Sequence, residues 1–361
     1  TSVGQGERCQ NSGSQQWAAT TEDGVTWKQI PENPVIRNTD APGKRLTEWR
    51  DPFVFRWKGK NYCLVAGIVD EKYGAVHLYT TNDFRSWTYV NEFFRNTCAK
   101  EVMECPNLIV YGDKVLFIHS IWDIRVLHWF VGTITEEGKL EVYNQGSVDY
   151  GDFFASQISF DEKGRTLMWG WLREDPRRGL YTDGEWSGAQ AIPRVISINE
   201  ENELVQERLP EFETLRRTDE EVQLQNFTGR YEFKTVSGTA EMEGTIQSDD
   251  VFSFRFLADS DGQEYTDVII NPREGTYYAP MEDSSLIKSV DKRPILGCFR
   301  REKDGSVHVD ILIDNSVAEI FINGNSAMTL RIYPQMEGGR MSVETKGLIA
   351  DAEIHVYEIG L

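Results

Sequence analysis

The sequence is poor in cysteine and histidine and lacks the spacings that would combine them into a metal site. The cysteines are Cys9, Cys63, Cys98, Cys105 and Cys298, and the histidines are His77, His119, His128, His308 and His355. Because the five cysteines include no CxxC pair, neither a disulfide framework nor a zinc ribbon is predicted, and at least one thiol is free or pairs outside the chain. The histidines lack the i, i+4 spacing of a helical metal site, so we expect no metal.

Basic residues and long apolar segments are also scarce. Lysine and arginine number 38 against 58 aspartates and glutamates, which leaves a formal net charge of −20. Such an excess repels phosphate backbones and acidic membrane surfaces, so we expect no nucleic-acid partner. No run approaches the ~18 apolar residues of a membrane helix, and residues 1–16 lack the apolar core of a signal peptide. We therefore expect a soluble chain with no membrane partner.

What the sequence does contain is the composition of a folded protein. Hydrophobic residues make up 40% and aromatic residues 12% of the 361 residues, enough for two or three domains with cores of their own. Short apolar or alternating runs recur between Gly, Asn and Asp, a pattern typical of an all-β protein. We predict strands at residues 61–68, 75–80, 115–120, 127–133, 166–172, 251–258 and 307–313.

Helical periodicity is nearly absent, and residues 209–223 are the one candidate for a short helix. This stretch suggests a linker at 209–222 between a domain at 1–208 and a second at 223–361. In the second domain alternation is more regular, and Asn323-Gly324 is a strong signal for a two-residue hairpin, because both central residues of a type I′ turn need positive φ. A β-sandwich fits this half best.

A weak internal repeat lies in the first domain. The segment Thr21–Trp27 is echoed by Thr81–Trp87, and in each an Asp-containing turn is followed by a Trp four residues after the Asp. Repeated four-stranded units that bury equivalent aromatics, as in a β-propeller, would produce this pattern. The alternative is a pair of unrelated hairpins that each contain a Trp.

Three acidic segments stand out because their carboxylates lie among aromatic or apolar residues. They are Trp49–Phe53, Val102–Pro106 and Asp149–Phe154. Loss of solvent favours the neutral carboxyl, so Glu104 is a candidate proton donor near neutral pH, whereas Asp51 next to Arg50 should stay ionised. Two carboxyl groups shifted in opposite directions are typical of glycoside hydrolysis. The alternative is that these are turn residues that cap strands.

Several motifs in order along the chain resemble those of glycoside hydrolase family 32. They are Arg50-Asp51-Pro52, Glu104-Cys105-Pro106, Asp152-Phe153-Phe154-Ala155-Ser156-Gln157, Gly164-Arg165 and Trp169-Gly170-Trp171, and residues 311–334 are similar to the family's sandwich signature. This family comprises invertases, inulinases, levanases and fructosyltransferases. The resemblance implies an all-β fold in which a five-bladed β-propeller is followed by a β-sandwich.

The resemblance also implies an activity and roles for individual residues. Asp51 resembles the family's transition-state stabiliser, and Glu104 resembles its general acid/base. The implied enzyme is a retaining β-fructosidase that acts on terminal β-D-fructofuranosyl linkages in sucrose or fructans, with possible transfer to a sugar hydroxyl and no cofactor. Arg50 would orient Asp51 or contact a substrate hydroxyl, or else form a salt bridge inside the propeller.

Further residues are candidates for contact with the sugar. Asp149 and Asp152 match the acidic position before the family's Phe-Tyr-Ala segment, with the spacing one residue short of many members, so that which of them faces the site stays open. Trp49, Trp122 and Trp171 could wall a sugar subsite by stacking, although a buried Trp is more often part of a core. Cys105 has no histidine partner in sequence and is assigned to packing.

One family motif is missing from these 361 residues, namely the nucleophile motif Trp-Met-Asn-Asp-Pro-Asn-Gly. A catalytically silent carbohydrate-binding relative is therefore the alternative function. Residues 1–4 resemble the end of a family strand deep in the second blade, which implies that about 60 to 100 residues of propeller are absent. We expect a second polypeptide, an N-terminal fragment or a subunit, to supply the nucleophilic Asp. The single sequon, Asn226-Phe227-Thr228, favours a secreted protein.

Overall fold

The computed structural model describes residues 2–3, 14–41, 46–69, 73–96, 102–122, 124–173 and 187–360. Contacts along the chain divide it into two compact units. Unit 1 comprises Thr1–Ser147, Phe154–Ile158 and Ile198–Leu204, and unit 2 comprises Val148–Phe153, Ser159–Ser197 and Val205–Leu361. Almost every described element is a strand, and within the described residues no helix has both the length and the apolar character needed to cross a membrane.

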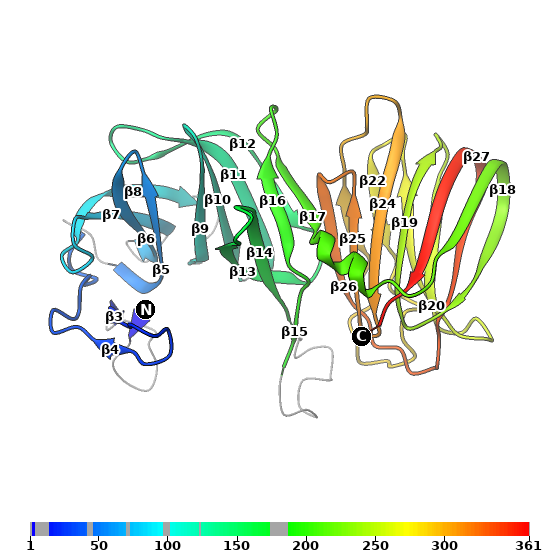
Figure 1. The fold of residues 1–361 in the computed structure, drawn as a ribbon, viewed down its shortest axis with the longest axis horizontal. Coiled ribbons are helices and arrows are strands. Elements are labelled where there is room, and N and C mark those ends of the chain that lie inside the picture. The colour runs from blue at the N-terminus through cyan, green and yellow to red at the C-terminus, as the bar shows by residue number, and fades with distance from the viewer. Residues whose placement is uncertain are drawn as a thin grey trace. The chain divides into compact units, whose positions relative to one another are not determined.

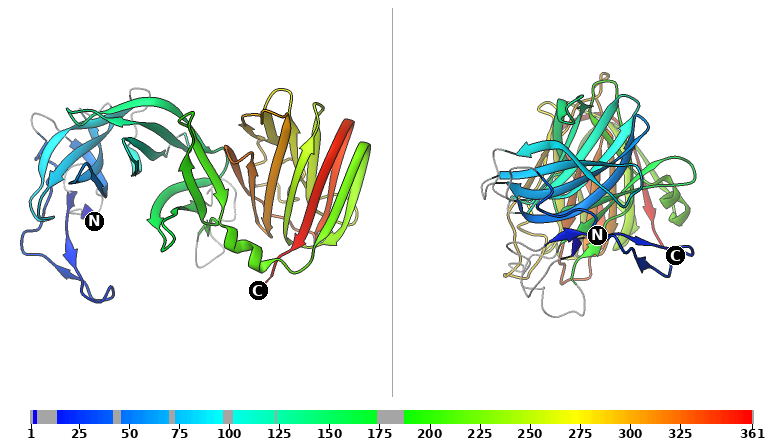
Figure 2. Two further views of the ribbon diagram at one scale, coloured as in Figure 1. Left: turned by 45° about the horizontal axis from the view of Figure 1, so that its top comes forward. Right: turned by 90° about the vertical axis from the view of Figure 1, so that its left-hand side faces the viewer.

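Unit 1 is built mainly from two four-stranded antiparallel sheets (Figures 1 and 2). The first contains β5 (Leu46–Trp57), β6 (Lys60–Val69), β7 (Tyr73–Thr81) and β8 (Thr88–Asn96), in that order. The second contains β9 (Met103–Tyr111), β10 (Lys114–Ile121), β11 (Val126–Ile134) and β12 (Leu140–Asp149), again in chain order. Two small hairpins precede them: β1 (Ser2–Val3) pairs with β2 (Gln15–Gln16), and β3 (Ala19–Thr20) pairs with β4 (Lys28–Gln29).

The two large sheets pack against each other through their apolar faces. Phe93 and Phe117 meet edge to face with their ring centroids 5.4 Å apart, and Leu78 and Leu108 belong to the same buried cluster. Because neighbouring elements cover both faces of such a four-stranded sheet, its inner strands are continuously apolar in sequence, as in residues 115–118. This packing brings β5 and β9, the first strand of each sheet, side by side.

The repeated turn predicted from the sequence is present, but its aromatic residues are not equivalent. Asp23 Oδ1 accepts hydrogen bonds from the backbone N–H groups of residues 25 and 26, and Asp83 Oδ1 accepts them from residues 85 and 86. Trp87 packs edge to face on a neighbouring ring, whereas Trp27 is 62% exposed. The expectation of burial is therefore wrong for Trp27, because β4 lies in a two-stranded sheet and β8 in a four-stranded one.

A third sheet contains β13 (Phe153–Phe160), β14 (Thr166–Leu172), β16 (Arg194–Ile198) and β17 (Leu204–Arg208), with β15 (Ala189–Gln190) beside β14. Its first strand again forms one edge. After β17 the chain forms a short 3₁₀-helix, η2 (Pro210–Leu215), which takes up only the first part of the helix candidate at residues 209–223. From residue 220 onward the chain is again a strand.

The rest of unit 2 is one ten-stranded sheet that folds over its own core. Its strands are β18 (Glu220–Val236), β19 (Thr239–Gln247), β20 (Phe252–Ala258), β21 (Thr266–Asn271), β22 (Thr276–Ala279), β23 (Ile295–Cys298), β24 (Ser306–Asp314), β25 (Val317–Ile322), β26 (Ser326–Arg331) and β27 (Arg340–Glu358). The order is β23-β22-β21-β20-β27-β19-β24-β25-β26, and β18 pairs with β27. Asn323 and Gly324 have φ of 51° and 61°, the positive values expected for the hairpin between β25 and β26.

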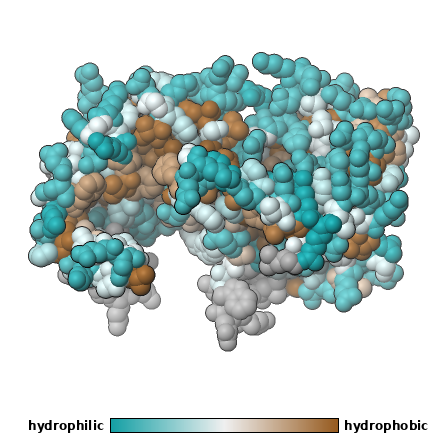
Figure 3. Space-filling view, viewed as in Figure 1, coloured by the Kyte–Doolittle hydropathy of each residue, from teal (hydrophilic) through white to brown (hydrophobic). Residues whose placement is uncertain are grey.

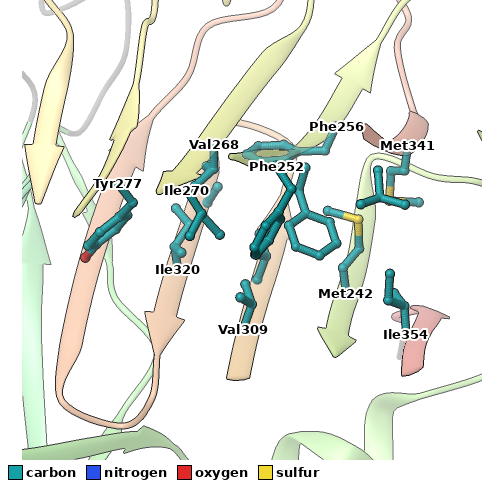
Figure 4. Close-up of a cluster of buried hydrophobic side chains, with 14 of the residues drawn as sticks. Met242, Phe252, Phe256, Val268, Ile270, Tyr277, Val309, Ile320, Met341 and Ile354 are labelled. Atoms are coloured by element: carbon teal, nitrogen blue, oxygen red, sulfur yellow. The ribbon is translucent and has the colours of Figure 1, made fainter. Parts of the chain in front are cut away.

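The core of this sheet follows from its alternating sequence. In β21 every second side chain is buried. In Figure 4, Phe252 and Phe256 from β20, Ile320 from β25 and Met242 from β19 point into one cluster. Each fully buried side chain of this size stabilises the folded state by roughly 1.5–3 kcal/mol.

In the view of Figure 3 the outer surface over these strands is mainly hydrophilic, while more apolar surface shows over the four-stranded sheets. All seven predicted strands are present.

Candidate active site

Two irregularities in β5 position the first group of polar side chains. The pairing of β5 with β6 shifts register on both sides of Arg50, and Glu48 and Asp51 have left-handed backbones with φ of 53° and 56°. An extra residue in a strand turns the neighbouring side chains away from the regular alternation. Arg50 and Asp51 consequently have polar atoms within reach of β9, and Glu48 has one within reach of Arg50.

The first strand of the next sheet has a matching irregularity. Cys105 has φ of 49°, and the pairing of β9 with β10 shifts register beside it. The backbone N–H of Cys105 donates a hydrogen bond of 2.9 Å to Asp51 Oδ2. Glu104, the preceding residue, is thereby placed next to the β5 group. The structure therefore brings together the two carboxylates that the sequence singled out, Asp51 and Glu104.

The guanidinium of Arg50 lies at the centre of this group. Its Nη2 donates to Glu104 Oε1 and its Nη1 donates to Glu48 Oε2, both at 2.8 Å. Its Nε is 4.0 Å from Asp51 Oδ2. Arg50 is thus hydrogen-bonded to Glu104 and Glu48, and its Nε lies at the limit of an ion pair with Asp51. Glu48 was not singled out from the sequence, although it stands only two residues before Arg50.

The exposure of these side chains leaves room for a ligand. The side chains of Glu104 and Asp51 are 20% and 31% exposed, so each carboxyl group is held by the protein on one side and open on another. Burial, together with the negative charges of Asp51 and Glu104, raises the pKa of Cys105 to about 12. Its thiol therefore stays protonated near neutral pH, which agrees with its assignment to packing.

A third strand repeats the same backbone feature within unit 1. Ala155 in β13 has φ of 52°, and its N–H donates to Ser120 Oγ at 3.2 Å. Asn107 Nδ2 donates to the carbonyl oxygens of Cys105 and Ser156, both at 2.8 Å, and so ties β9 to β13. Sequence reasoning missed Asn107 and Ser120. For Asn107 a signal existed, since it directly follows the Glu-Cys-Pro motif.

The three candidate tryptophans lie in different environments. Trp122 is 48% exposed and meets the buried Phe154 edge to face at 5.7 Å, so part of its ring is at the surface of unit 1. Trp49 is only 1% exposed and packs against Tyr79, so its proposed role in a subsite wall is corrected to a core residue. Trp171 is half-buried in unit 2, where it pairs with Gln190 across β14 and β15.

Asp149 and Asp152 lie in unit 2 and face β26. The Asp149 side chain is fully buried, and its oxygens accept hydrogen bonds from Arg194 Nη2 at 2.8 Å and from Thr329 N and Oγ1 at 3.0 and 2.8 Å. Asp152 Oδ2 accepts from the backbone N–H of Arg331 at 3.1 Å. Asp149 is therefore corrected from a substrate contact to a structural carboxylate, because all of its acceptor capacity is used inside the protein. The Asp152 carboxylate, only 7% exposed as a residue, is also directed to the strand.

The buried His119 in β10 is not charged near neutral pH. Burial lowers its pKa to about 3, with a further contribution from His128. His128 is half-buried, and burial lowers its pKa as well. In the described part of the chain, no three His, Cys, Asp or Glu side chains are grouped so that they could hold a metal ion.

Comparison with known proteins agrees with this geometry. The family model described as the glycosyl hydrolases family 32 N-terminal domain matches residues 3–208, and the family 32 C-terminal model matches residues 211–358. A fructan 6-exohydrolase of Beta vulgaris is 24% identical over 86% of this chain and 62% of that protein. A fructan 1-exohydrolase of Aegilops tauschii is 25% identical over 85% of this chain and 63% of that protein. The chain thus spans less than two thirds of the length of these relatives.

Solved structures show the same fold. Fructan 1-exohydrolase IIa of Cichorium intybus superposes with a TM-score of 0.80 at 20% identity over 96% of this chain and 79% of that chain. The exo-inulinase of Aspergillus awamori superposes with a TM-score of 0.81 at 20% identity over 96% of this chain and 74% of that chain. The predicted all-β class, a β-propeller followed by a β-sandwich, is confirmed. With both family models matched along its length, the chain belongs to family 32 of the glycosyl hydrolases.

Proposed function

We propose that this chain carries the acid/base and the stabilising carboxylate of a retaining β-fructosidase, which hydrolyses terminal β-D-fructofuranosyl linkages in sucrose or fructans. The observation that supports this most strongly is the juxtaposition of Asp51 and Glu104, on the first strands of adjacent sheets, through the hydrogen bond from Cys105 N and the ion pair with Arg50. The names of the similar proteins, fructan exohydrolases and β-fructofuranosidases, support the substrate class.

The proposed reaction has two steps. Glu104 protonates the glycosidic oxygen while a nucleophilic carboxylate attacks the anomeric carbon, which releases the leaving sugar and forms a fructosyl-enzyme. Glu104 then removes a proton from water, which attacks the same carbon and frees fructose. Asp51 accepts hydrogen bonds from hydroxyls of the fructosyl ring as positive charge develops. If a sugar hydroxyl replaces water, the product is a longer fructan.

The nucleophile is proposed to come from a second polypeptide. The 361 residues do not contain the family's Asn-Asp-Pro motif, and they span only 62% of the length of the Beta vulgaris relative. Denaturing mass spectrometry on purified, active material should reveal a co-purifying polypeptide that contains the motif. Full activity from a sample that contains this chain alone would contradict the proposal.

The central test is an activity assay on sucrose, inulin and levan with the wild type and Glu104→Gln. The amide keeps the shape of the side chain but cannot donate a proton, so turnover should fall by on the order of 10²- to 10⁴-fold. Glu92→Gln is a matched control, because Glu92 is also paired with an arginine, Arg95, but lies in β8 away from the Asp51–Glu104 pair. A Glu104→Gln variant that keeps its rate would remove Glu104 from the acid role.

A second candidate function is that of a carbohydrate-binding relative without catalysis, and the missing nucleophile motif favours it. The same samples distinguish the two functions. Binding of fructan by isothermal calorimetry, without any release of reducing sugar even from material purified with all its partners, would support this candidate and exclude the β-fructosidase.

Secretion is a further part of the proposal. The sequon at Asn226 lies exposed at a bulge of β18, a strand that pairs only with β27 among the described strands, and is therefore accessible to a glycosyl transferase. Fractionation of the source cells should find the protein outside the cytosol. Retention in the cytosol would contradict secretion without affecting the proposed chemistry.

A further inference from the structure

Glu48 shares one guanidinium with the proposed acid/base. Arg50 donates from Nη1 to Glu48 Oε2 and from Nη2 to Glu104 Oε1, each at 2.8 Å. The Glu48 side chain is 22% exposed, close to the 20% of Glu104. The two glutamates are therefore held in similar environments on the two ends of a single planar fork.

The backbone of β5 is distorted to place Glu48 there. Glu48 is a non-glycine residue with φ of 53°, and the register of β5 shifts between Thr47 and Arg50. At this irregularity Glu48 Oε2 lies 2.8 Å from Arg50 Nη1. Strained positions of this kind cluster at functional sites.

The electrostatic consequence concerns the proton on Glu104. A single arginine next to a carboxyl group favours its ionised form, which opposes the role of a proton donor. A second carboxylate on the same arginine offsets that effect. The charged groups that face Glu104 include Arg50, Glu48 and Asp51 from β5, whereas His119 in the neighbouring β10 is kept neutral by burial and the Cys105 thiol is protonated.

We propose that Glu48 is a positioning residue, which holds Arg50 between two carboxylates and keeps Glu104 available as the proton donor. This inference rests on the proposed function of Glu104. It assigns Glu48 no contact with the substrate and no part in bond formation.

The test compares the wild type with Glu48→Gln by two independent measurements. The first is the titration of the Glu104 carboxyl carbon by ¹³C NMR on protein labelled in its glutamates, with Glu104→Gln used to identify the signal. The second is the pH dependence of kcat/KM. Loss of the negative charge of Glu48 leaves the full positive charge of Arg50 to Glu104, which favours its ionised form. The Glu104 midpoint and the alkaline limb of the rate profile should both move to lower pH by on the order of one unit.

Matched variants separate the effect of the Glu48 charge from the effect of damage to the fold. Glu48→Asp keeps the charge and should restore most of the wild-type midpoint. Glu92→Gln removes an equally well-formed arginine pair in β8, where Arg95 donates twice at 2.6 Å, and should change neither measurement. Thermal unfolding of each variant verifies that the protein is folded.

The outcomes are distinguishable. A shifted Glu104 midpoint in a protein that never releases fructose would support the role of Glu48 and contradict the proposed function. An active enzyme in which Glu48→Gln lowers kcat equally at every pH, with an unmoved Glu104 midpoint, would overturn the inference and leave Glu48 a purely structural residue. A midpoint that moves to higher pH would overturn it as well.

Discussion

At the scale of the residue, left-handed backbone positions in β5, β9 and β13 determine where the polar groups lie. Glu48 and Asp51 occupy such positions in β5, Cys105 in β9 and Ala155 in β13. Each costs on the order of 1–3 kcal/mol of backbone strain. The N–H groups of Cys105 and Ala155 offset part of that cost by donating to Asp51 and to Ser120.

The sequence predicted Asp51 and Glu104 through their motifs, but it did not predict Glu48. Alternation of apolar and polar residues shows which face of a regular strand a residue occupies, and a bulge of one residue leaves no trace in that pattern. Trp49 illustrates the same limit. An aromatic residue beside a polar motif gives the same sequence pattern whether its ring lies in the core, as here, or against a sugar.

Asp51→Ala is predicted to lower kcat more than it raises KM. The hydrogen bonds that a carboxylate accepts from ring hydroxyls strengthen as the transition state forms, so their removal affects the chemical step more than binding. Steady-state kinetics on sucrose and on the best fructan substrate would measure the changes in kcat and KM separately. We expect kcat to fall by on the order of 100-fold or more. Asp113→Ala, in an exposed turn, is the control. An unchanged kcat with a raised KM would make Asp51 a residue of ground-state binding only.

At the scale of the element, a buried ion-pair network joins the end of β12 to strands of the ten-stranded sheet. Arg194 Nη2 lies 2.8 Å from Asp149 and 3.0 Å from Glu319, and all three side chains are essentially inaccessible to solvent. Burial raises the pKa of Glu319, although Arg194 and the N–H of Ile192 act in the opposite direction. The sequence could not identify this network, because its members come from three distant segments. In addition, an acidic residue among aromatic residues gives the same sequence pattern whether it lies in a core or in a cleft.

Asp149→Ala is predicted to destabilise the protein by about 3–5 kcal/mol. Removal of Asp149 breaks up a buried network: Arg194 loses one of its two carboxylate partners and keeps Glu319, and Thr329 N–H loses its acceptor. Urea unfolding followed by fluorescence would measure the loss. Lys163→Ala is the matched control, since its pair with Glu211 is exposed and should contribute less than about 1 kcal/mol. Equal stability of the two variants would show that the network around Asp149 contributes little.

The strands themselves were the most predictable elements. Their period-two pattern depends only on which face of the strand is buried, and the alternation of residues along the strand itself shows this. Which strands pair was not predictable in the same way: β27 pairs with β18, β19 and β20, segments about 100 residues away in sequence. The hairpin at Asn323 is the exception, since its turn residues specify the pairing of adjacent strands.

At the scale of the whole molecule, excess negative charge extends into the interior. In unit 2 the buried or half-buried acids Glu241, Glu243 and Asp310 form a cluster with Arg208 and Arg216, three acids for two bases. The exposed Glu213 lies at the edge of this cluster, 3.5 Å from Arg208. Asp310 Oδ2 accepts from Arg208 at 2.7 Å, whereas its Oδ1 is buried and has no hydrogen-bond partner among the residues that the structure describes. One proton on Asp310 would balance the charges of this cluster.

The pKa of Asp310 is consistent with such a proton. Burial raises it from 3.8 to about 7, and the charges of Glu241 and Glu243 add to the effect while Arg208 opposes it. Between these two values the folded protein binds a proton that the unfolded chain releases. By linkage, the stabilisation from this proton is complete below about pH 4 and is lost as the pH rises to about 7.

Asp310→Asn should therefore become more stable relative to the wild type as the pH increases. The amide is neutral at every pH and can still accept from Arg208, so the variant loses the part of the pH dependence that Asp310 causes. The difference in unfolding free energy between variant and wild type should grow by up to about 1.4 kcal/mol per pH unit between roughly pH 4 and 7 and be constant above that range. Urea unfolding at a series of pH values measures it, and the use of a difference cancels the contribution of the other acids to a chain of net charge −20. Parallel stability curves for the two proteins across this range would show that Asp310 is ionised in the folded state throughout.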